Sequence, residues 1–350
     1  MEFFDTTITQ EAKNLVMECL ASERVSSGKM VERFESILSE KYPNSFTVNS
    51  GTSALHMALI LAGVGQGDEV IIPAQTFVAT GLAILYQRAV PIFCDIEYHT
   101  GNIDPNKVVD CISKYTKAVM AVSWGGQSPE LKKLREVCDQ YDLKLIVDNA
   151  HAFGTNVKYE DFSCFSFQAI KSLTTGDGGL VVCKNSEDCE MGKRLSWFGI
   201  DRKRDLPNPN TGERMYNLYE VGYKYHMNDI AAALGIGNLY AFKENQLHRK
   251  KIADYYEDSL PKYSVLRNNS MDWLYTLLVD RRTEFVKMMT SKNIPVSVVH
   301  LGIHKNKIFS NGFNLPVQKW WDSHHICIPL HVGITESDAE RVVDAIKGGW

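Results

Sequence analysis

The 350-residue sequence lacks the patterns that mark several common classes of protein. Its longest apolar stretch, SALHMALILAGVG, is too short and too polar to cross a bilayer, so we expect no membrane segment. The first ten residues, MEFFDTTITQ, have neither a basic region nor an apolar core, so they do not resemble a signal peptide. A net charge of −4 at pH 7 offers no basic face for nucleic acid.

Metal, disulfide and triphosphate-binding patterns are missing as well. The eight cysteines are scattered, with neither a CxxC pair nor zinc-finger spacing, and they predict reduced thiols in a cytoplasmic protein. His300 and His304 are four residues apart but lack the glutamate of HExxH, so this spacing indicates no metal site and favours loop or structural histidines. The sequence has no GxxxxGK[ST] motif, which argues against a nucleotide-triphosphate P-loop.

What is present is a long alternation of strands and helices. Continuous Val- and Ile-rich runs between helices favour a mostly parallel sheet that helices cover on both faces. After about residue 235 the pattern changes to a long polar helix, short strands and a last helix. We therefore expect a large α/β domain over residues 1–235 and a smaller α+β domain over residues 236–350. The pattern predicts strands near 46–48, 69–74, 90–96, 117–124, 144–150, 161–167 and 178–184, and helices over 9–24, 28–41, 76–87, 105–114, 129–142, 245–260 and 336–348.

The stretch NSGTSALHMAL places Gly51, Thr52 and Ser53 at the junction of a strand and an apolar helix. Free backbone N–H groups and the helix dipole at such a junction attract an anion such as phosphate. Ordinary capping of the helix by a serine or threonine explains the same residues, and the motif alone does not separate the two interpretations.

A second signal lies in LIVDNAHAFG, where an apolar strand ends in Asp148 and His151 follows three residues later. Ligands of parallel sheets bind at the carboxyl ends of the strands, so Asp148 is a candidate for holding a metal or a protonated ring nitrogen. The alternatives are a carboxylate that caps the next turn and a histidine that belongs to the core. Two titratable groups at one strand end favour a site.

The third signal is the single lysine of FSFQAIKSLTTGDGG. Lys171 lies between a predicted buried strand and a Thr- and Gly-rich loop, 23 residues after Asp148. Pyridoxal phosphate needs a phosphate cradle, a carboxylate at its ring nitrogen and a lysine to which it is linked covalently. The chain has a candidate for each of the three, and we predict that it binds this cofactor.

These segments resemble the sugar aminotransferases of the DegT/DnrJ/EryC1/StrS family, and the resemblance covers residues 26–236 and the C-terminal end. The segments that carry it are SSGKMVERFE, VNSGTSALHMAL, DEVIIPAQTFVAT, VDNAHAFG, FSFQAIKSLTTGDGG, GYKYHMNDIAAALG and IPLHVGITESDAERVV. The resemblance implies the fold type I of pyridoxal-phosphate-dependent transferases, with a mostly parallel seven-stranded sheet flanked by helices and a smaller C-terminal α+β domain.

The resemblance also implies a role for each matching residue. Lys171 would bind the cofactor covalently and move protons, and Asp148 would pair with its ring nitrogen. Phe77 would stack on the ring, and His151 would lie beside the ring near its hydroxyl. Hydroxyl contacts to the phosphate would come from Thr52, Ser53 and Ser166.

Some residues depart from the family pattern. Lys224 and His226 stand where the GYNYR stretch of the family has Asn and Arg, Asp177 replaces the Glu of TGEGG, and Asn149 replaces an Ala. The resemblance implies that Lys224 reaches the cofactor phosphate of a partner subunit in a homodimer with shared active sites. His226, Lys224 and His300 are our candidates for contacts to the substrate.

The implied reaction transfers an amino group from glutamate to a keto sugar linked to a nucleotide diphosphate. The stretch GYKYHMNDIAAALG is more similar to the branch that aminates C4, so we favour a 4-keto-6-deoxy sugar. Alternatives are amination at C3, a keto-cyclitol acceptor, and a non-catalytic regulatory protein that binds the cofactor. A sugar dehydratase of the same family is disfavoured, because its lysine is replaced by histidine. No nucleic-acid or membrane partner is expected.

Overall fold

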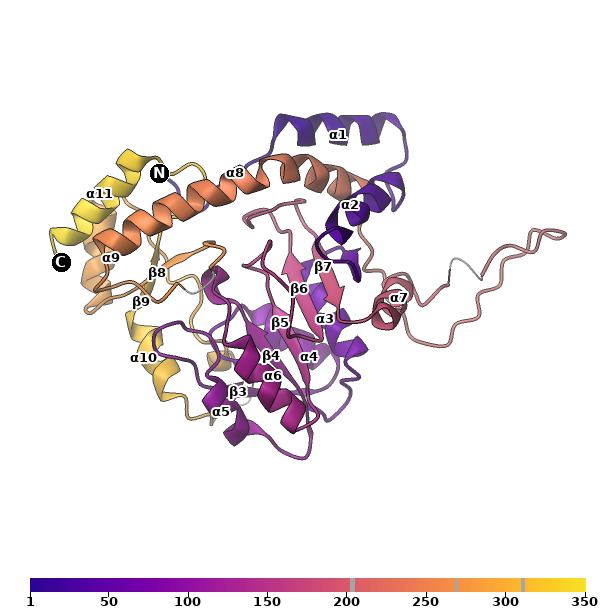
Figure 1. Cartoon of the computed structure of the whole chain (residues 1–350), viewed down its shortest axis with the longest axis horizontal. Coiled ribbons are helices and arrows are strands. Elements are labelled where there is room, and N and C mark those ends of the chain that lie inside the picture. The colour runs from indigo at the N-terminus through magenta and orange to yellow at the C-terminus, as the bar shows by residue number, and fades with distance from the viewer. Residues whose placement is uncertain (202–204, 268–269, 310–311) are drawn as a thin grey trace.

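The computed structural model describes residues 1–201, 205–267, 270–309 and 312–350. Within these ranges the chain forms a seven-stranded sheet with helices on both faces and a smaller group of elements at its C-terminal end (Figure 1). The order of the strands across the sheet is β1-β7-β6-β5-β4-β2-β3. Their bounds are β1 Ser45–Val48, β2 Glu69–Pro73, β3 Val90–Cys94, β4 Thr116–Val122, β5 Lys144–Asp148, β6 Phe162–Ser166 and β7 Gly179–Cys183.

The sheet is mostly parallel, as predicted. Strand β7 alone runs antiparallel to its neighbours, which are β6 and β1. Successive side chains of one strand pack into hydrophobic clusters on opposite faces of the sheet. Val70 and Ile72 of β2 pack toward helices α3 (Gly51–Leu61) and α4 (Val78–Tyr86), whereas Ile71 packs toward α5 (Pro105–Val108) and α6 (Leu131–Gln140). Strands that are buried on both faces explain the continuous apolar runs of the sequence. The bounds of the helices are α1 Gln10–Ala21, α2 Lys29–Ser39, α3 Gly51–Leu61, α4 Val78–Tyr86, α5 Pro105–Val108, α6 Leu131–Gln140 and α7 Ser186–Leu195.

The helix predicted over residues 105–114 is shorter than expected. Helix α5 gives way to the 3-10 turn η1 Val109–Cys111, and Ile112 is already extended. β-Branched residues at 108, 109 and 112 lose side-chain freedom in a helix, which weakens its continuation here.

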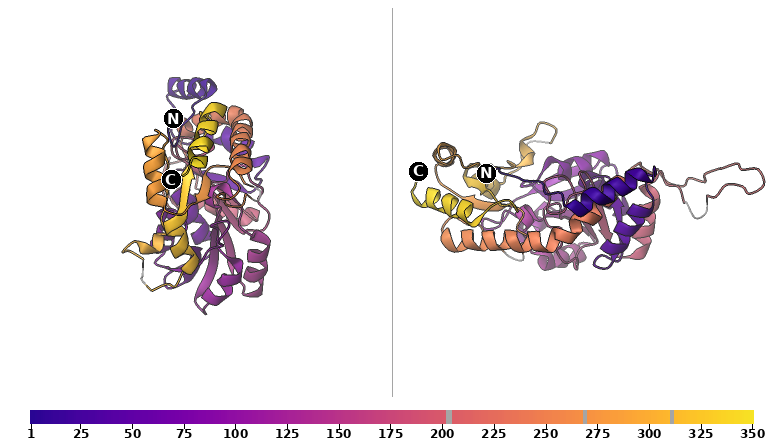
Figure 2. Two further views of the ribbon diagram at one scale, coloured as in Figure 1. Left: turned by 90° about the vertical axis from the view of Figure 1, so that its left-hand side faces the viewer. Right: turned by 90° about the horizontal axis from the view of Figure 1, so that it is seen from above.

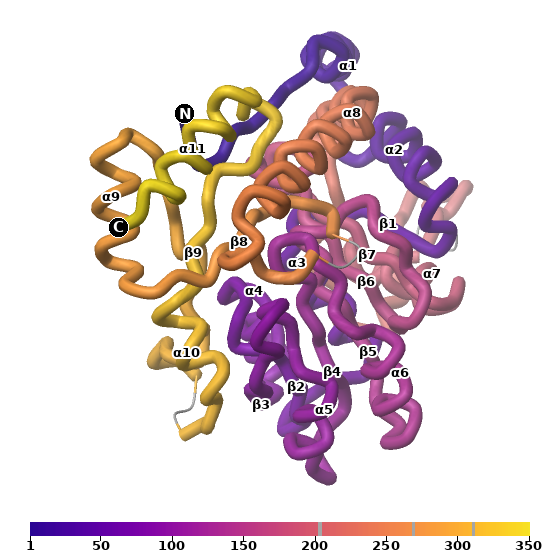
Figure 3. The backbone as a smooth tube through the Cα atoms, turned by 60° about the vertical axis from the view of Figure 1, so that its left-hand side comes forward, coloured from indigo at the N-terminus to yellow at the C-terminus, as the bar shows by residue number. Residues whose placement is uncertain are grey.

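The C-terminal elements lie together on one side of the sheet (Figure 3). They form a two-stranded antiparallel sheet with helices packed around it, in agreement with the predicted α+β character. The 3-10 turn η3 spans Ile303–Lys305. The remaining bounds are α8 Asp229–Ser259, β8 Tyr275–Leu278, α9 Arg282–Ser291, α10 Pro316–His324, β9 His325–Ile328 and α11 Glu336–Lys347.

Helix α8 is longer than the sequence predicted. It has 31 residues, begins after the N-cap Asn228 and runs unbroken across residue 235, so the backbone has no break where we placed the domain boundary. The division at residue 235 stays a prediction. Gly235 and Gly237 occur inside the helix because neighbouring elements approach closely: a Cβ on Gly237 would lie 2.2 Å from the backbone nitrogen of Ala12.

The N-terminal segment lies against the C-terminal elements. The N-terminus lies beside α11 (Figure 1), and His331 Nε2 is 3.0 Å from the carbonyl oxygen of Glu2. Asp95, which follows β3, accepts the N–H groups of Val317 and Gln318 at the start of α10, both at 2.9 Å. In the described part of the chain we find no helix with the length and apolarity that a membrane crossing requires. The cytoplasmic location stays a prediction.

The close approach of α1 to α8 at Gly237 predicts that a larger side chain here destabilises the protein. Gly237→Val should force α1 away from α8 and destabilise the protein by about 2 kcal/mol, or roughly 4 °C in Tm. Thermal unfolding followed by circular dichroism measures this shift. The control is Gly65→Val, where the nearest atom to an added Cβ is 4.0 Å away. Equal effects of the two substitutions would contradict the proposed packing.

Candidate active site

A cavity of about 430 Å³ lies at the carboxyl edge of the sheet. Its walls come from segments that are far apart in the sequence: the junctions after β1, β2, β5 and β6, the C-terminal elements, and the N-terminal residue Phe4. Six residues named from the sequence as cofactor contacts meet here, together with His300. The lining residues that bear on function are Ser50, Gly51, Thr52, Phe77, Asp148, His151, Ser166, Gln168, Ile170, Lys171, Trp273 and His300.

Asp148 is the last residue of β5 and is buried. Its Oδ2 accepts a hydrogen bond from Thr80 Oγ1 at 2.8 Å, and its Oδ1 accepts from Ala150 N at 3.1 Å. Burial raises the pKa of the carboxyl group, whereas these two donors and the charge of Lys171 lower it. Among the described residues none forms an ion pair with Asp148, so the carboxylate can accept a cationic N–H from a bound molecule. It also caps the next turn, which was the simpler interpretation of the sequence.

Lys171 follows β6 in a tight turn, where its N–H donates to the carbonyl of Gln168 at 2.9 Å. Its Nζ lies 3.7 Å from the ring centroid of Trp273. Burial lowers the pKa of Lys171 to about 7, and the charge of Asp148 opposes this shift. At neutral pH a large fraction of this amine is therefore unprotonated and nucleophilic. The loop that follows turns sharply at Gly176, which has a φ of 79°.

The N-terminus of α3 forms one wall of the cavity. Ser50 is its N-cap and accepts the N–H of Ser53 at 3.0 Å, and the hydroxyl of Ser53 donates to Asn49 at 2.7 Å. Ser53 therefore does not line the cavity, and Ser50 and Thr52 do. A Cβ on Gly51 would lie 2.8 Å from the Cβ of Ser166, so only glycine brings this helix end so close to β6. Backbone N–H groups of a first turn and nearby hydroxyls fit a phosphate.

His151, Phe77 and His300 supply aromatic walls. His151 is buried, its Nδ1 accepts the N–H of Gly125 at 3.3 Å, and burial lowers its pKa well below the usual range. The proton of the neutral ring is therefore on Nε2. Phe77 is half exposed, and its ring centroid lies 5.0 Å from that of His300. Burial also lowers the pKa of His300, to about 4.

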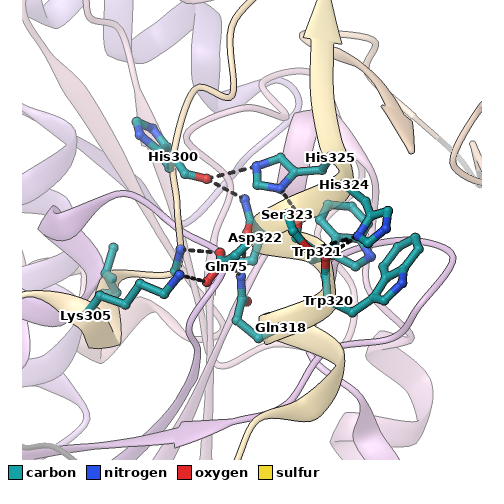
Figure 4. Close-up of polar contacts among 12 residues, drawn as sticks. Gln75, His300, Lys305, Gln318, Trp320, Trp321, Asp322, Ser323, His324 and His325 are labelled. Carbon is teal, nitrogen blue, oxygen red and sulfur yellow. Dashed lines mark hydrogen bonds and ion pairs between the residues drawn. The ribbon is translucent and has the colours of Figure 1, made fainter. Parts of the chain in front are cut away.

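A buried polar network holds the backbone of His300 (Figure 4). The carbonyl oxygen of His300 accepts from Gln75 Nε2 at 3.1 Å and lies 3.0 Å from His325 Nε2. Gln318 Nε2 donates to Gln75 Oε1 at 2.8 Å and to Asp322 Oδ1 at 2.9 Å. The network joins α10 to the loop after β2, and it fixes where the His300 ring stands against Phe77.

Besides Ser53, two residues named from the sequence lie outside this cavity. Lys224 and His226 flank Trp197: Lys224 Nζ is 5.6 Å from a ring centroid of Trp197, and the centroid of His226 is 4.1 Å away. His226 lines a separate cavity of about 470 Å³. Within one chain the structure does not bring these two residues to Lys171, and their contact to a partner's site stays a prediction.

Three residues that the sequence did not single out contribute to the site. Thr80 holds Asp148, Trp273 covers Lys171 and stacks on His151 with centroids 3.8 Å apart, and Phe4 lines the cavity. The spacing of Thr76 and Thr80, one helical turn apart near a site segment, is a signal for the first. Trp273 and Phe4 occur in segments without a motif.

A lysine with a lowered pKa, a buried carboxylate and a helix N-terminus at the carboxyl edge of an α/β sheet are the groups that an enzyme with a phosphorylated cofactor would need. The comparisons with known proteins agree. Residues 6–347 match the model of the DegT/DnrJ/EryC1/StrS aminotransferase family, and the chain belongs to this family. It is an enzyme of the transaminase class, and the resemblance inferred from the sequence is confirmed.

A sequence relative and two solved structures support the assignment to this family. The chain is 32% identical over 296 residues to the GDP-perosamine synthase of Vibrio cholerae, covering 80% of this chain and 78% of that protein. It shares 28% identity and a TM-score of 0.93 with the sugar aminotransferase CalS13 of Micromonospora echinospora, with both chains fully covered. NtdA of Bacillus subtilis with its cofactor PMP bound has 27% identity and a TM-score of 0.88, over 97% of this chain and 82% of that one. The predicted transferase fold is thereby confirmed.

The electrostatics of the site predict how the reactivity of the Lys171 amine depends on pH. In the cofactor-free protein, acylation of Lys171 by acetic anhydride should rise with a midpoint near pH 7, against about 10.4 for an ordinary lysine. Asp148→Asn removes the negative charge that raises the pKa of Lys171, so the midpoint should move to lower pH. Peptide mapping by mass spectrometry gives the pH profile. Asp110→Asn, at an exposed site, is the control and should change nothing. An upward or absent shift in Asp148→Asn would contradict the assigned electrostatics.

Proposed function

We propose that this chain is a pyridoxal-phosphate-dependent aminotransferase that moves the amino group of glutamate to C4 of a nucleotide-linked 4-keto-6-deoxy sugar. The observation that carries the proposal is the nearly buried Lys171, with a pKa of about 7, in one cavity with Asp148 and the N-terminus of α3. Family membership supports the transamination, and the similarity to a GDP-perosamine synthase supports the sugar and its C4 position.

The residues of the cavity fit the cofactor. The N-terminus of α3, with Thr52 and Ser166, would bind the phosphate, and Asp148 would hold the ring nitrogen. Phe77 and His151 would lie against the ring, and Lys171 would carry it covalently. When bound, pyridoxal phosphate supplies the electron sink that stabilises negative charge on the substrate carbon. The relative NtdA with bound PMP, the aminated form of this cofactor, supports the assignment.

The chain's own residues then have distinct tasks. The Lys171 amine, once released, is neutral in a large fraction of molecules near pH 7, and in this form it can take a proton from the substrate carbon and return it to a neighbouring carbon. The two donors to Asp148 keep its carboxylate oriented, so that it stabilises a proton on the ring nitrogen. Trp273 covers the amine and keeps water from it.

We also propose a homodimer in which Lys224 completes the phosphate site of the partner subunit. A bound phosphate carries nearly two negative charges, yet Lys171 is the only lysine or arginine among the described residues that line the cavity. A cation must therefore come from elsewhere, and a lysine on a flexible stem can reach across an interface. Near Lys224, residues 205–221 project from the body (Figure 2). They carry exposed apolar side chains, which are typical of a protein interface: Leu206, Met215, Leu218, Tyr219 and Val221.

The first test of this function concerns Lys171. Borohydride reduction of the holoenzyme followed by peptide mapping should label Lys171, and Lys171→Ala should keep the fold while transamination falls on the order of 10³-fold or more. Product analysis after incubation with glutamate and a panel of 3-keto sugars, 4-keto sugars and keto-cyclitols identifies the acceptor. Labelling of another lysine would overturn the assignment of the site, and activity confined to cyclitols or 3-keto sugars would overturn the proposed substrate.

The second test concerns Lys224. Lys224→Ala should weaken cofactor retention and activity. In hybrids of Lys224→Ala and Lys171→Ala subunits, one site carries both defects and the other carries neither, so part of the activity should return. Hybrids of Lys224→Ala with an exposed-site variant such as Lys243→Ala serve as the control for subunit exchange. If the hybrids form and mixing restores nothing, Lys224 does not act in trans.

A further inference from the structure

The first nine residues lie against the loop that carries Lys171. Thr6 Oγ1 donates to the carbonyl of Ala169 at 3.0 Å, two residues before the reactive lysine. Farther along, Thr9 N donates to Asn238 Oδ1 at 3.0 Å, and Glu2 is held through His331. This N-terminal segment, residues 2–9, is therefore anchored at both ends and in its middle, and its side chains have defined positions beside the cavity.

Phe4 is the residue of this segment that enters the cavity wall. Its ring stacks on Trp273 with centroids 5.4 Å apart and an interplanar angle of 20°. Trp273 is buried, donates its indole N–H to the carbonyl of Ile170 at 2.9 Å, and lies under the Lys171 amine. Phe4 and Trp273 thus form one aromatic wall beside the atom at which the chemistry takes place. Phe3 contacts Phe4 edge to face, at 4.6 Å and 77°, and is not part of the lining.

The chemistry of this wall favours one of the two substrates of a transamination. The face of an aromatic ring carries negative potential, so it repels the two carboxylates of glutamate. The C–H face of a pyranose ring is apolar, with slightly positive hydrogens, and packs well on an aromatic face. Ile170 and Val299, which also line the cavity, extend the apolar surface available to a deoxygenated sugar carbon.

We propose that Phe4, supported by Trp273, is the platform on which the sugar ring of the amino acceptor stacks, so that Phe4 determines specificity for the acceptor and not for the amino donor. This inference rests on the proposed function. Trp273 itself cannot be varied without disturbing Lys171 and His151, whereas Phe4 touches the site from a separate segment.

The experiment separates the two half-reactions of the holoenzyme. Single-turnover absorbance measurements give the rate with glutamate and, for the aminated enzyme, the rate with a GDP-linked 4-keto-6-deoxyhexose. Phe4→Ala should lower kcat/KM for the keto sugar about tenfold or more, mainly through KM, and leave the glutamate half-reaction within about twofold. Phe4→Tyr should restore wild-type values, because it keeps the aromatic face. Phe4→Leu keeps apolar volume without that face and should behave like Phe4→Ala.

The matched control is Phe3→Ala, which removes a neighbouring ring outside the lining and should leave both half-reactions within about twofold. Circular dichroism checks the fold, and Phe4→Leu decides the question if Phe4→Ala does not fold. The platform is overturned if Phe4→Leu keeps full kcat/KM for the sugar, or if the variants slow both half-reactions equally. A wild-type enzyme that reacts with glutamate but with no keto sugar would instead overturn the proposed function, and the acceptor role of Phe4 with it.

Discussion

The site depends on the burial of two opposite charges at one edge of the sheet. Loss of water lowers the pKa of Lys171 and raises that of Asp148, and the charge of each group partly offsets the shift of the other. The surrounding elements keep this balance in place: the hydroxyl of Thr80 and the N–H of Ala150 stabilise the carboxylate, while the ring of Trp273 packs against the amine. A more exposed lysine would be fully protonated near neutral pH and a poor nucleophile. A carboxylate without these donors would tend to take up a proton and could no longer hold a cationic ring.

The structure also explains why distant parts of the chain must be folded before the site exists. The His300 ring stands against Phe77 because Gln75, Gln318 and Asp322 hold its backbone through a buried network. Asp95, which directly follows β3 of the large sheet, caps the helix from which Gln318 comes. Buried hydrogen-bond networks of this kind tolerate little change, because each partner lost leaves another group unsatisfied. The position of this cavity wall is therefore specified by residues that do not themselves line the cavity.

Much of the fold was predictable from the sequence, because its signals are local. Apolar runs gave the strands, and Asp148 and Lys171 were recognisable because each follows such a run. Which serine faces the cavity was not predictable: Ser50 occupies the N-cap and Ser53 turns to Asn49, an outcome that depends on three-dimensional contacts. Trp273 and Phe4 come from segments more than 100 residues away from Lys171, without periodicity or motif to connect them. The first half of α8 was also missed, because Gly235 and Gly237 are poor helix formers that the packing of α1 and α2 requires.

Helix α8 has a mechanical consequence. Its 31 residues make a single rod about 46 Å long, which belongs to the large sheet at one end and to the C-terminal elements at the other. The large sheet and the C-terminal elements are joined by a continuous helix and not by a flexible linker. Any change in the angle between them must therefore bend α8 itself. Bending by about 5° displaces its far end by roughly 4 Å, at the cost of strained backbone hydrogen bonds. The stiffness of this helix thus limits, together with the buried network of Gln75 and Gln318, how far the walls contributed by the C-terminal elements can move from the reactive lysine.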